Sequence, residues 1–366
     1  MHVKRPTASC IWNSFLNSGK RHLILTGSRS CGKTTLLKEL FPGNVLGLTT
    51  WAERQNAVYL RDNISREKVN VGVFDKSREG KENRMVPVPD AFETFGVGVL
   101  NNCAKAEGQW VTVDEVGYLE AFCVPYIKAL EELFEKKQIA AVVRKQDIPF
   151  LQSLCLRDDA FVVDLDDPFG NIGCVIMASG LGKRFGGNKL MADFGGQPMI
   201  TRILDATEGI FAGRVVVTRS EEVANLCKTR GIETVLHDLP FRNDTVRLGI
   251  EAMEGVERCM FATGDQPLLS ANTVASLALN AKAGADFIWR PMCDGVPGSP
   301  VVFPRWAFYE LKDLPEGKGG SVVIKKYMDK LRTVTVRDMF ELKDVDSIED
   351  LKDILEIMEK GERLQV

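Results

Sequence analysis

Two apolar segments, each followed directly by a glycine-rich loop and a helical pattern, constrain the fold of this chain more than any other feature. The first is HLILTG at 22–27, and the second is GCVIMASG at 173–180. A buried strand that leads through a glycine-rich loop into a helix begins an α/β unit whose loop can hold phosphate. The sequence therefore predicts two α/β domains, each with its own phosphate site.

The length of the chain agrees with two domains, because 366 residues exceed a single ordinary hydrophobic core. The polar stretch DLDDPFGN at 164–171 contains proline and glycine and has the composition of a domain boundary. We therefore expect one domain at 1–168 and another at 169–366.

Short β-branched runs alternate with helical periods in both halves, which predicts parallel sheets covered by helices. In such sheets ligands bind outside the carboxyl ends of the strands. The expected strands lie near 22–26, 71–74, 110–114, 139–143, 160–164, 173–178, 214–218, 233–236, 258–263, 286–290, 300–303 and 333–337.

The composition excludes several classes of protein. The formal net charge of -3 offers no basic excess for binding a nucleic-acid backbone. No apolar run approaches the roughly 18 residues that cross a bilayer, and residues 1–20 lack the pattern of a signal peptide. Nine separate cysteines and three histidines suit neither a disulfide framework nor a zinc centre. We expect a soluble, cytoplasmic protein that binds neither nucleic acid nor membrane.

The first glycine-rich loop, GSRSCGKT at 27–34, fits the phosphate-loop pattern G-x-x-x-x-G-K-[ST]. Its glycines let backbone N–H groups turn toward phosphate oxygens, and the N-terminus of a helix expected at 34–41 adds its dipole. The lysine of this pattern reaches the β- and γ-phosphates, and its hydroxyl residue coordinates Mg²⁺. We expect a nucleotide to bind at Gly27, Gly32, Lys33, Thr34 and Thr35.

The run QWVTVDE at 109–115 ends an apolar strand with two acids. Asp114 is then expected to bind the nucleotide through the Mg²⁺ that Thr34 also holds, and Glu115 to orient a hydrolytic water. An acidic pair at a strand end is, by itself, more often a solvated turn. Together with the loop at Gly27, it indicates an NTPase.

GSRSCGKTTL and VDEVGYLE together resemble the small P-loop nucleoside triphosphatases of the THEP type, whose second motif reads D-E-[IV]-G-x-M-E. The resemblance covers about residues 20–165 and implies hydrolysis of ATP or GTP with Mg²⁺. Arg54 and Arg144 are candidates for sensing phosphate, with a surface charge as the alternative for each. Leu119 stands where methionine is usual, and the matching positions are Asp114, Glu115, Gly117 and Glu120.

The second loop, ASGLGKRFGGNK at 178–189, combines glycines with lysine and arginine. A dinucleotide-binding fingerprint would need a third glycine at Phe185, which is not there. Cations beside glycines suit a triphosphate, because a pyrophosphate leaving group accumulates negative charge. A merely solvated basic loop would not explain why the cations follow a buried strand. We expect the nucleotide at Ala178, Ser179, Gly180, Gly182 and Lys183, with Arg184 and Lys189 acting on its phosphates.

Two aspartates are candidates for catalysis and for a second Mg²⁺ site. Asp265 ends the apolar run CMFATGD, where a carboxylate can hold a hard cation. Asp346, in LKDVDSIEDL, can also be the N-cap of the last helix, with Glu349 completing a capping box. A residue that caps a helix can still present its other oxygen to a metal, so we assign both aspartates to the metal.

MASGLGKRFGGNKLM, GDQPLL, GSPVVF and DVDSIEDL occur in this order over about residues 172–355. These motifs resemble the MobA/MocA-type nucleotidyltransferases, most of all the molybdenum cofactor cytidylyltransferases. RNDTVRLGIEA at 242–252 is similar to that family's helix near the nucleobase, which places Asn243, Asp244 and Thr245 near the base. Both resemblances together imply a P-loop NTPase fold followed by a Rossmann-like nucleotidyltransferase fold with a mainly parallel sheet.

Three positions depart from the transferase pattern. Ser179 stands where cytidylyl enzymes usually have alanine and guanylyl enzymes glycine, so the choice of base stays open. Ser299 replaces a histidine on the acceptor side. Lys318 replaces a residue that is commonly acidic, which favours a phosphorylated acceptor.

The resemblance implies that the phosphate monoester of molybdopterin attacks the α-phosphorus of CTP and releases pyrophosphate, with Mg²⁺ held by Asp265 and Asp346. Because the second pKa of such a monoester is about 6, no strong base is needed, which agrees with an expected site without histidine. NTP hydrolysis in the first half would serve the handling of the acceptor or of a client molybdoenzyme. There are two alternatives. The chain could transfer the nucleotidyl group to a sugar or alcohol phosphate, or it could be a nucleotide-dependent delivery chaperone without transferase activity.

Overall fold

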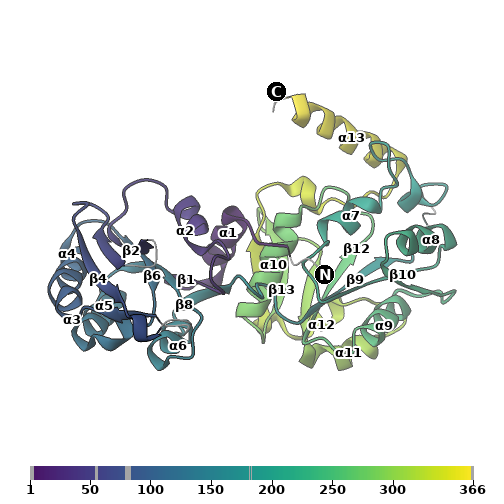
Figure 1. The fold of residues 1–366 in the computed structure, drawn as a ribbon. Helices are drawn as coiled ribbons and strands as arrows, with labels where there is room; N and C mark the ends of the chain where they lie inside the picture. The colour runs from purple at the N-terminus through teal and green to yellow at the C-terminus, as the bar shows by residue number, and fades with distance from the viewer. Residues whose placement is uncertain (1–3, 54–56, 79–83, 181, 183, 364–366) are drawn as a thin grey trace. The chain divides into compact units, whose positions relative to one another are not determined.

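The computed structural model describes residues 4–53, 57–78, 84–180, 182 and 184–363. The chain forms two compact units, an N-terminal unit at Thr7–Pro168 and a C-terminal unit from Phe169 onward. Residues 4–6 belong to the C-terminal unit, where Lys4 N–H donates to the Gly209 carbonyl at 2.7 Å. Each unit is built on its own sheet with helices on both faces (Figure 1).

The sheet of the N-terminal unit has the strand order β5-β4-β3-β2-β6-β7-β1-β8. Neighbouring strands pair in parallel through β2, β6, β7, β1 and β8. At the other side of the sheet, β2, β3, β4 and β5 form an antiparallel meander. The strands are β1 (His22–Thr26), β2 (Gly47–Glu53), β3 (Ala57–Asp62), β4 (Lys68–Phe74), β5 (Met85–Pro87), β6 (Trp110–Val116), β7 (Gln138–Val143) and β8 (Ala160–Asp164).

Helices cover both faces of this sheet. On one face, α4, α5 and α6 pack on the apolar side chains of β1, β6 and β7. On the other face, α2 contacts the central strands β1, β6 and β7, and α1 contacts α2 and the edge strand β8. Helix α1 begins at the N-cap Thr7, whose side chain accepts from Cys10 N–H, and ends at Gly19. The helices are α1 (Ala8–Ser18), α2 (Lys33–Leu40), α3 (Pro89–Ala91), α4 (Val97–Lys105), α5 (Val124–Lys136) and α6 (Pro149–Cys155).

The sheet of the C-terminal unit has the order β11-β10-β9-β12-β15-β13-β14, with β16 beside β13. The strands β11, β10, β9 and β12 are parallel, β15 is antiparallel to its neighbours, and β16 is parallel to β13. The strands are β9 (Ile172–Ala178), β10 (Gly213–Thr218), β11 (Glu233–Leu236), β12 (Arg258–Thr263), β13 (Ile288–Cys293), β14 (Val296–Pro297), β15 (Val301–Pro304) and β16 (Leu331–Thr335).

Two layers of helices enclose the second sheet. The helices α9, α11 and α12 pack their apolar residues on one face, and α7 and α10 lie on the other (Figure 1). The helices are α7 (Thr201–Ala206), α8 (Glu221–Thr229), α9 (Arg242–Ala252), α10 (Ala271–Ala283), α11 (Phe308–Lys312), α12 (Ser321–Lys326) and α13 (Ile348–Arg363).

The prediction of two α/β domains with mainly parallel sheets is confirmed. The strands expected at 22–26, 160–164, 233–236 and 258–263 have these same bounds in the structure. The short strands β2, β3, β5 and β14 were not predicted. Their sequences mix polar and apolar residues, and all four belong to antiparallel pairs, whose exposed side needs no apolar run.

Candidate functional site

The phosphate loop of the N-terminal unit joins β1 to α2 and is shaped by its glycines. Gly27 and Gly32 have φ values of 137° and 94°, a region that is strained for residues with a side chain. A Cβ at Gly27 would lie 2.9 Å from Cys31 Sγ, so a larger residue would also crowd the loop. The loop and Lys33–Thr35 line a cavity of about 720 Å³ beyond the carboxyl ends of the parallel strands.

Lys33 and Thr34 make their contacts in different directions. Lys33 Nζ donates to the carbonyl oxygens of Gly27 at 2.9 Å and Ser28 at 2.7 Å. Thr34 Oγ1 donates to Asp114 Oδ1 at 2.8 Å. The structure thus joins the two residues predicted to hold Mg²⁺ and keeps the lysine among neutral carbonyls.

Asp114 and Glu115, at the end of β6, have contrasting surroundings. Burial raises the pKa of the Asp114 carboxyl, and the hydrogen bond from Thr34 opposes this shift. Glu115 forms an ion pair with Arg144, the residue that follows β7. Glu115 also has a φ of 79°, a conformation that is rare outside glycine and that clusters at functional sites. Arg144 is therefore the partner of the predicted catalytic glutamate, whereas Arg54 lies outside the described residues.

Sequence reasoning did not assign a role to two further acids of this unit. Glu120 is 2% exposed and accepts a hydrogen bond from Gly117 N–H at 2.8 Å, and burial raises the pKa of its carboxyl to about 7. Asp166 accepts from Ser28, at 2.8 Å from the N–H and 2.7 Å from the hydroxyl. Asp166 follows β8 by two residues, and β8 runs parallel to β1, whose carboxyl end carries the phosphate loop. This position directly after a strand was the signal that could have identified Asp166 as a site residue.

In the C-terminal unit, the second glycine-rich loop joins β9 to the 3-10 turn η4 (Lys189–Met191). Gly182 has a φ of 57°, and a Cβ there would lie 2.2 Å from the Gly187 carbonyl oxygen, so a side chain does not fit. Lys183, a predicted phosphate-binding residue, lies outside the described residues.

The second loop borders a cleft of about 560 Å³. Two predicted nucleotide-binding residues do not line it: Ala178 is buried within β9, and Asn243 accepts a hydrogen bond from Gly317 N–H at 2.9 Å. The predicted residues that do line the cleft are Ser179, Gly180, Gly182, Thr245, Asp265 and Asp346.

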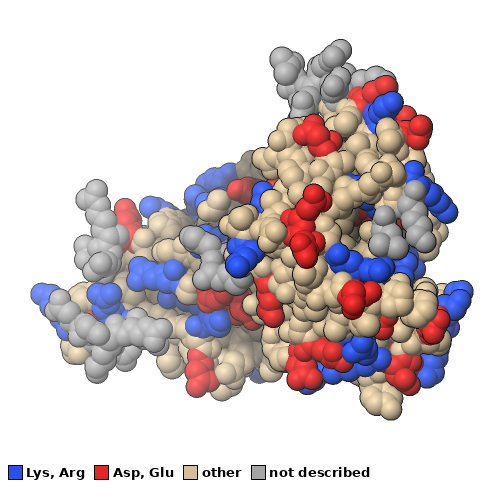
Figure 2. All heavy atoms as spheres, turned by 90° about the vertical axis from the view of Figure 1, so that its right-hand side faces the viewer, with Lys and Arg blue, Asp and Glu red and all other residues tan. Residues whose placement is uncertain are grey.

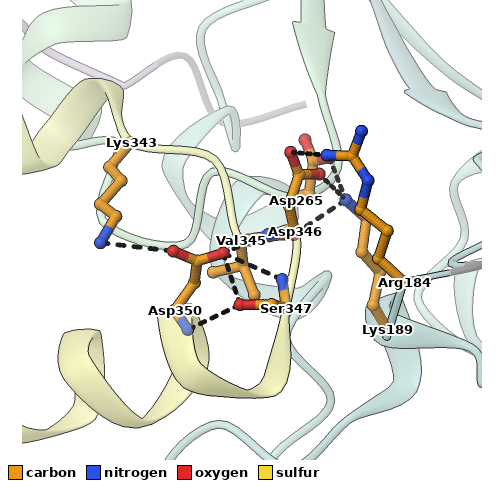
Figure 3. Close-up of polar contacts among 8 residues, drawn as sticks. All are labelled: Arg184, Lys189, Asp265, Lys343, Val345, Asp346, Ser347 and Asp350. Atoms are coloured by element: carbon orange, nitrogen blue, oxygen red, sulfur yellow. Dashed lines mark hydrogen bonds and ion pairs between the residues drawn. The ribbon is translucent and has the colours of Figure 1, made fainter. Parts of the chain in front are cut away.

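Lys189 brings the two predicted metal-binding aspartates together (Figure 3). Its Nζ lies 2.7 Å from Asp265 Oδ2 and 3.0 Å from Asp346 Oδ1, and it donates to the Val345 carbonyl at 2.8 Å. Burial acts to lower the pKa of the Lys189 amine, but the two carboxylates outweigh burial and raise it. Arg184 is largely exposed, and its Nη1 lies 3.9 Å from Asp346 Oδ2.

The start of α13 corrects the prediction that Asp346 caps the last helix. Ser347 Oγ accepts from Asp350 N–H at 3.1 Å, and Asp350 Oδ2 accepts from Ser347 N–H at 2.9 Å (Figure 3). This reciprocal pair is a capping box one residue later than the expected pair of Asp346 and Glu349. Because Ser347 supplies the cap, the Asp346 carboxylate faces Lys189 instead.

The aspartate pair has one property of a cation site. Asp265 Oδ1 is buried and has no hydrogen-bond partner in the part of the chain that the structure describes, as expected of an oxygen that ligates a cation. Within those same residues, no group of three or more His, Cys, Asp or Glu side chains is arranged to hold a metal. The coordination shell of a Mg²⁺ ion held by these two carboxylates would then be completed by nucleotide and water oxygens, which is common for Mg²⁺.

Sequence reasoning missed one residue that lines this cleft, Asp344, and one that contacts a lining residue, His237. Asp344 lines it, and burial, followed by the charges of Asp265 and Asp346, raises the pKa of the Asp344 carboxyl to about 6. His237 Nε2 lies 2.8 Å from Ser179 Oγ, and burial lowers the pKa of the imidazole. His237 contacts Ser179 without lining the cleft, so the expectation of a site without histidine stays a prediction. His237 follows β11, which lies two strands from β9 in the sheet, so its approach to the loop depends on the tertiary fold.

Comparison with known families assigns each half of the chain. The family described as NTPase matches residues 22–168, and the family described as MobA-like NTP transferase domain matches residues 174–332. The chain joins a THEP1-type NTPase domain to a MobA-like NTP transferase domain. The resemblances to THEP-type NTPases and to MobA-like transferases are thereby confirmed, and the cytidylyltransferase branch stays a prediction.

The relatives of the NTPase domain include nucleoside-triphosphatases THEP1 from two Thermotoga. The protein from Thermotoga sp. strain RQ2 is 25% identical over 152 residues, which are 40% of this chain and 86% of the relative. The protein from Thermotoga petrophila is 27% identical over 154 residues, which are 40% of this chain and 84% of the relative.

Solved structures similar to this chain include two transferases or synthetases. A nucleotidyl transferase from Methanothermobacter is 19% identical and covers 52% of this chain and 99% of its own, with a TM-score of 0.44. The CMP:2-keto-3-deoxy-manno-octonic acid synthetase, solved with CTP, is 14% identical. The match covers 52% of this chain and 98% of the synthetase chain, with a TM-score of 0.43.

The surface drawn in Figure 2 carries acidic and basic side chains interspersed over the same face. Both signs also meet within the MobA-like domain, where exposed ion pairs join Arg230 to Asp205 and Lys312 to Glu254. Among the described residues, none of the helices combines the length and the apolar character that a membrane crossing needs.

Proposed function

We propose that the MobA-like domain transfers CMP from CTP to the phosphate of molybdopterin and releases pyrophosphate. The observation that carries this proposal is the convergence of Asp265 and Asp346 on Lys189 beside a cleft that the glycine-rich loop lines. Such an arrangement suits nucleotidyl transfer, because fixed charges are needed where negative charge accumulates on the departing pyrophosphate.

In the proposed reaction an oxygen of the acceptor phosphate attacks the α-phosphorus of CTP, and the bond from that phosphorus to the pyrophosphate oxygen breaks. Because the second pKa of the acceptor monoester is about 6, the attacking oxygen is already ionised at neutral pH. Asp265 and Asp346 would hold Mg²⁺, which at such sites neutralises charge on phosphate oxygens. Lys189 fixes both carboxylates toward one point, and the exposed Arg184 offsets the charge of the leaving pyrophosphate.

For the THEP1-type domain we propose hydrolysis of ATP or GTP. Lys33 would exchange its carbonyl partners for phosphate oxygens, Thr34 and Asp114 would hold Mg²⁺, and Glu115 would orient the attacking water. The bond between Thr34 and Asp114 supports this arrangement, since it brings both ligands to one place. Hydrolysis is proposed to serve the handling of molybdopterin or of a client molybdoenzyme, because joining two domains raises the effective concentration between their sites.

Pyrophosphate release, measured with each of the four NTPs in the presence and absence of molybdopterin, tests the transferase proposal. We expect release only when CTP and molybdopterin are both present. Asp265→Ala should abolish it, whereas the matched control Asp353→Ala, an exposed position on α13, should not.

Three other results would change the proposal in different ways. Release with a sugar or alcohol phosphate instead of molybdopterin would replace the acceptor and keep the reaction. Nucleotide binding without release under any of these conditions would indicate a delivery chaperone. Near-full activity of Asp265→Ala would overturn the assignment of the site.

A further inference from the structure

A second cavity in the THEP1-type domain, with a volume of about 270 Å³, lies beside Glu115. Its wall includes residues of the antiparallel strands β3, β4 and β5, and the phosphate-loop cavity does not reach β4 or β5. The two cavities are neighbours with a shared wall. The residues that line both are Arg29, Thr50, Trp51, Ala52, Glu115 and Arg144.

The charged groups of this second cavity leave a positive surplus. Arg29 and Arg84 line it, and neither forms an ion pair with any residue that the structure describes. Arg144 is paired with Glu115, so these two charges offset each other. Glu120 is buried, and its carboxyl, with a pKa of about 7, is only partly ionised at neutral pH. A cavity lined by guanidinium groups attracts an anion and can bind its oxygens through paired N–H donors.

The uncharged part of the wall offers fixed aromatic surface. Trp51 stacks on Tyr59 with ring centroids 5.7 Å apart and planes inclined by 27°, and the Arg61 guanidinium lies 5.4 Å from the Trp51 centroid. The Tyr118 hydroxyl accepts from Met85 N–H at 3.0 Å, which holds this ring as well. Aromatic side chains that are already held in place suit a planar ring, because little conformational entropy is lost when the ring binds.

We propose that this cavity binds a small molecule with an aromatic ring and a negatively charged group, as a second ligand of the domain beside the nucleotide. Its volume is at the small end of ligand pockets, which span roughly 300–1,000 Å³, so it fits one ring system rather than a second nucleotide. Since Glu115 and Arg144 belong to both walls, the second ligand lies next to the group proposed to orient water.

The inference deepens the proposed NTPase function, and its test needs no turnover. The probe is 8-anilinonaphthalene-1-sulfonate, an aromatic anion whose fluorescence rises on binding. It is titrated against the full chain in saturating Mg²⁺, a non-hydrolysable ATP analogue and CTP, so that both proposed nucleotide sites are filled. We expect one saturable binding event that persists in the presence of both nucleotides.

Two variants and their controls locate that binding event. Arg84→Glu reverses a charge in the wall and should weaken binding about ten-fold or more. Trp51→Ala removes a ring surface and should weaken it about three- to ten-fold, whereas Trp51→Phe keeps a ring and should lose less. Arg21→Glu makes the same charge change at an exposed position outside the cavity and should leave the affinity within about two-fold.

Each contrary result has a definite meaning. Loss of probe binding when the ATP analogue is added would make the cavity part of the nucleotide site and overturn the inference. Equal weakening by Arg84→Glu and Arg21→Glu, or no weakening by Arg84→Glu, would overturn it too. Saturable binding that follows these variants, in a protein that hydrolyses no NTP, would support the cavity and refute the proposed NTPase instead.

Discussion

The two phosphate sites of this chain use a lysine in opposite ways. In the THEP1-type domain, Lys33 is held by two neutral carbonyls, while Thr34 and Asp114 pair with each other. In the MobA-like domain, Lys189 is bound between two carboxylates. A lysine held by carbonyls can move to a phosphate without separating opposite charges, whereas Lys189 is a fixed part of an acidic centre. A lysine after a glycine-rich loop therefore need not itself be the phosphate ligand.

The largest effects are expected when each site is disabled in turn in the full chain and both activities are measured. Lys33→Ala should lower NTP hydrolysis about 10²- to 10³-fold, because it removes a cation from the reacting phosphates. Asp265→Ala should lower pyrophosphate release by a similar factor, because it removes a carboxylate proposed to hold the Mg²⁺ that neutralises them. The other activity should stay within about two-fold in each case. Lys128→Ala, at an exposed position on α5, is the control for Lys33→Ala. Equal loss of both activities in either variant would show that the sites are not independent.

A second test uses the buried acid of the first site. The pKa of Glu120 is about 7 in the folded protein against an ordinary 4.5, so the folded state binds more protons between these values. The contribution of Glu120 to the free energy of unfolding should therefore fall as pH rises from about 4.5 to about 7 and then stay level, while buried His22, whose pKa is lowered to about 4, acts in the opposite direction. Between about pH 5 and pH 8, Glu120→Gln should remove roughly 2–3 kcal/mol of this decrease.

Urea unfolding of wild type and Glu120→Gln at these two pH values measures that difference. Glu131→Gln, at an exposed position on α5, is the matched control and should follow wild type. An unchanged pH dependence in Glu120→Gln would mean that Glu120 is already ionised in the folded domain at low pH.

A third test compares the two lysines directly. Lys189→Met leaves Asp265 and Asp346 facing each other without their shared cation and should lower the free energy of unfolding by about 2 kcal/mol, less than for a fully buried pair because Asp346 is exposed. Lys33→Met breaks only bonds to carbonyls and should cost about 1 kcal/mol or less.

Thermal unfolding with and without millimolar Mg²⁺ measures both effects. Mg²⁺ should restore part of the stability of Lys189→Met, since a cation can replace the ammonium group between the carboxylates. It should restore little in Lys33→Met without nucleotide. Similar rescue of the two variants would remove the distinction between the sites.

The smallest expected effect concerns the cap of α13, next to Asp346. Ser347→Ala removes the side chain that accepts from Asp350 N–H and should destabilise the helix by about 1 kcal/mol. Hydrogen exchange of the first amides of α13 measures this change. Pyrophosphate release should fall a few-fold while NTP hydrolysis does not, because the cap positions Asp346. Thr7→Ala, which removes the cap of α1 in the other domain, is the control and should leave pyrophosphate release unchanged.

Local patterns predicted those parts of the sites that lie close together in sequence. Gly27 to Thr34 and Gly182 are recognisable because a strand, a glycine turn and a helix or turn follow one another directly. Asp114 and Asp265 are recognisable because each ends an apolar strand. The meeting of Asp265 with Asp346 could be expected only from the family resemblance, since 80 residues separate them in the numbering.

Contacts that depend on the tertiary fold were not predictable from one sequence. His237 reaches Ser179 only because β11 lies two strands from β9. Asp166 was placed in a boundary by its composition, although it holds the backbone of Ser28. The cap of α13 was assigned one residue too early, because DVDS offers two adjacent candidates and only the backbone geometry distinguishes them.

The hydrogen bond from Lys4 to Gly209 has a topological consequence. Since residues 4–6 belong with the later part of the chain, the MobA-like domain is discontinuous, and the THEP1-type domain is inserted between its first residues and Phe169. The backbone therefore crosses between the two domains twice, near Thr7 and near Pro168. A transferase fragment that began at Phe169 would lose the donor for Gly209, so excising this domain calls for a circular permutation or a short fused segment rather than one cut.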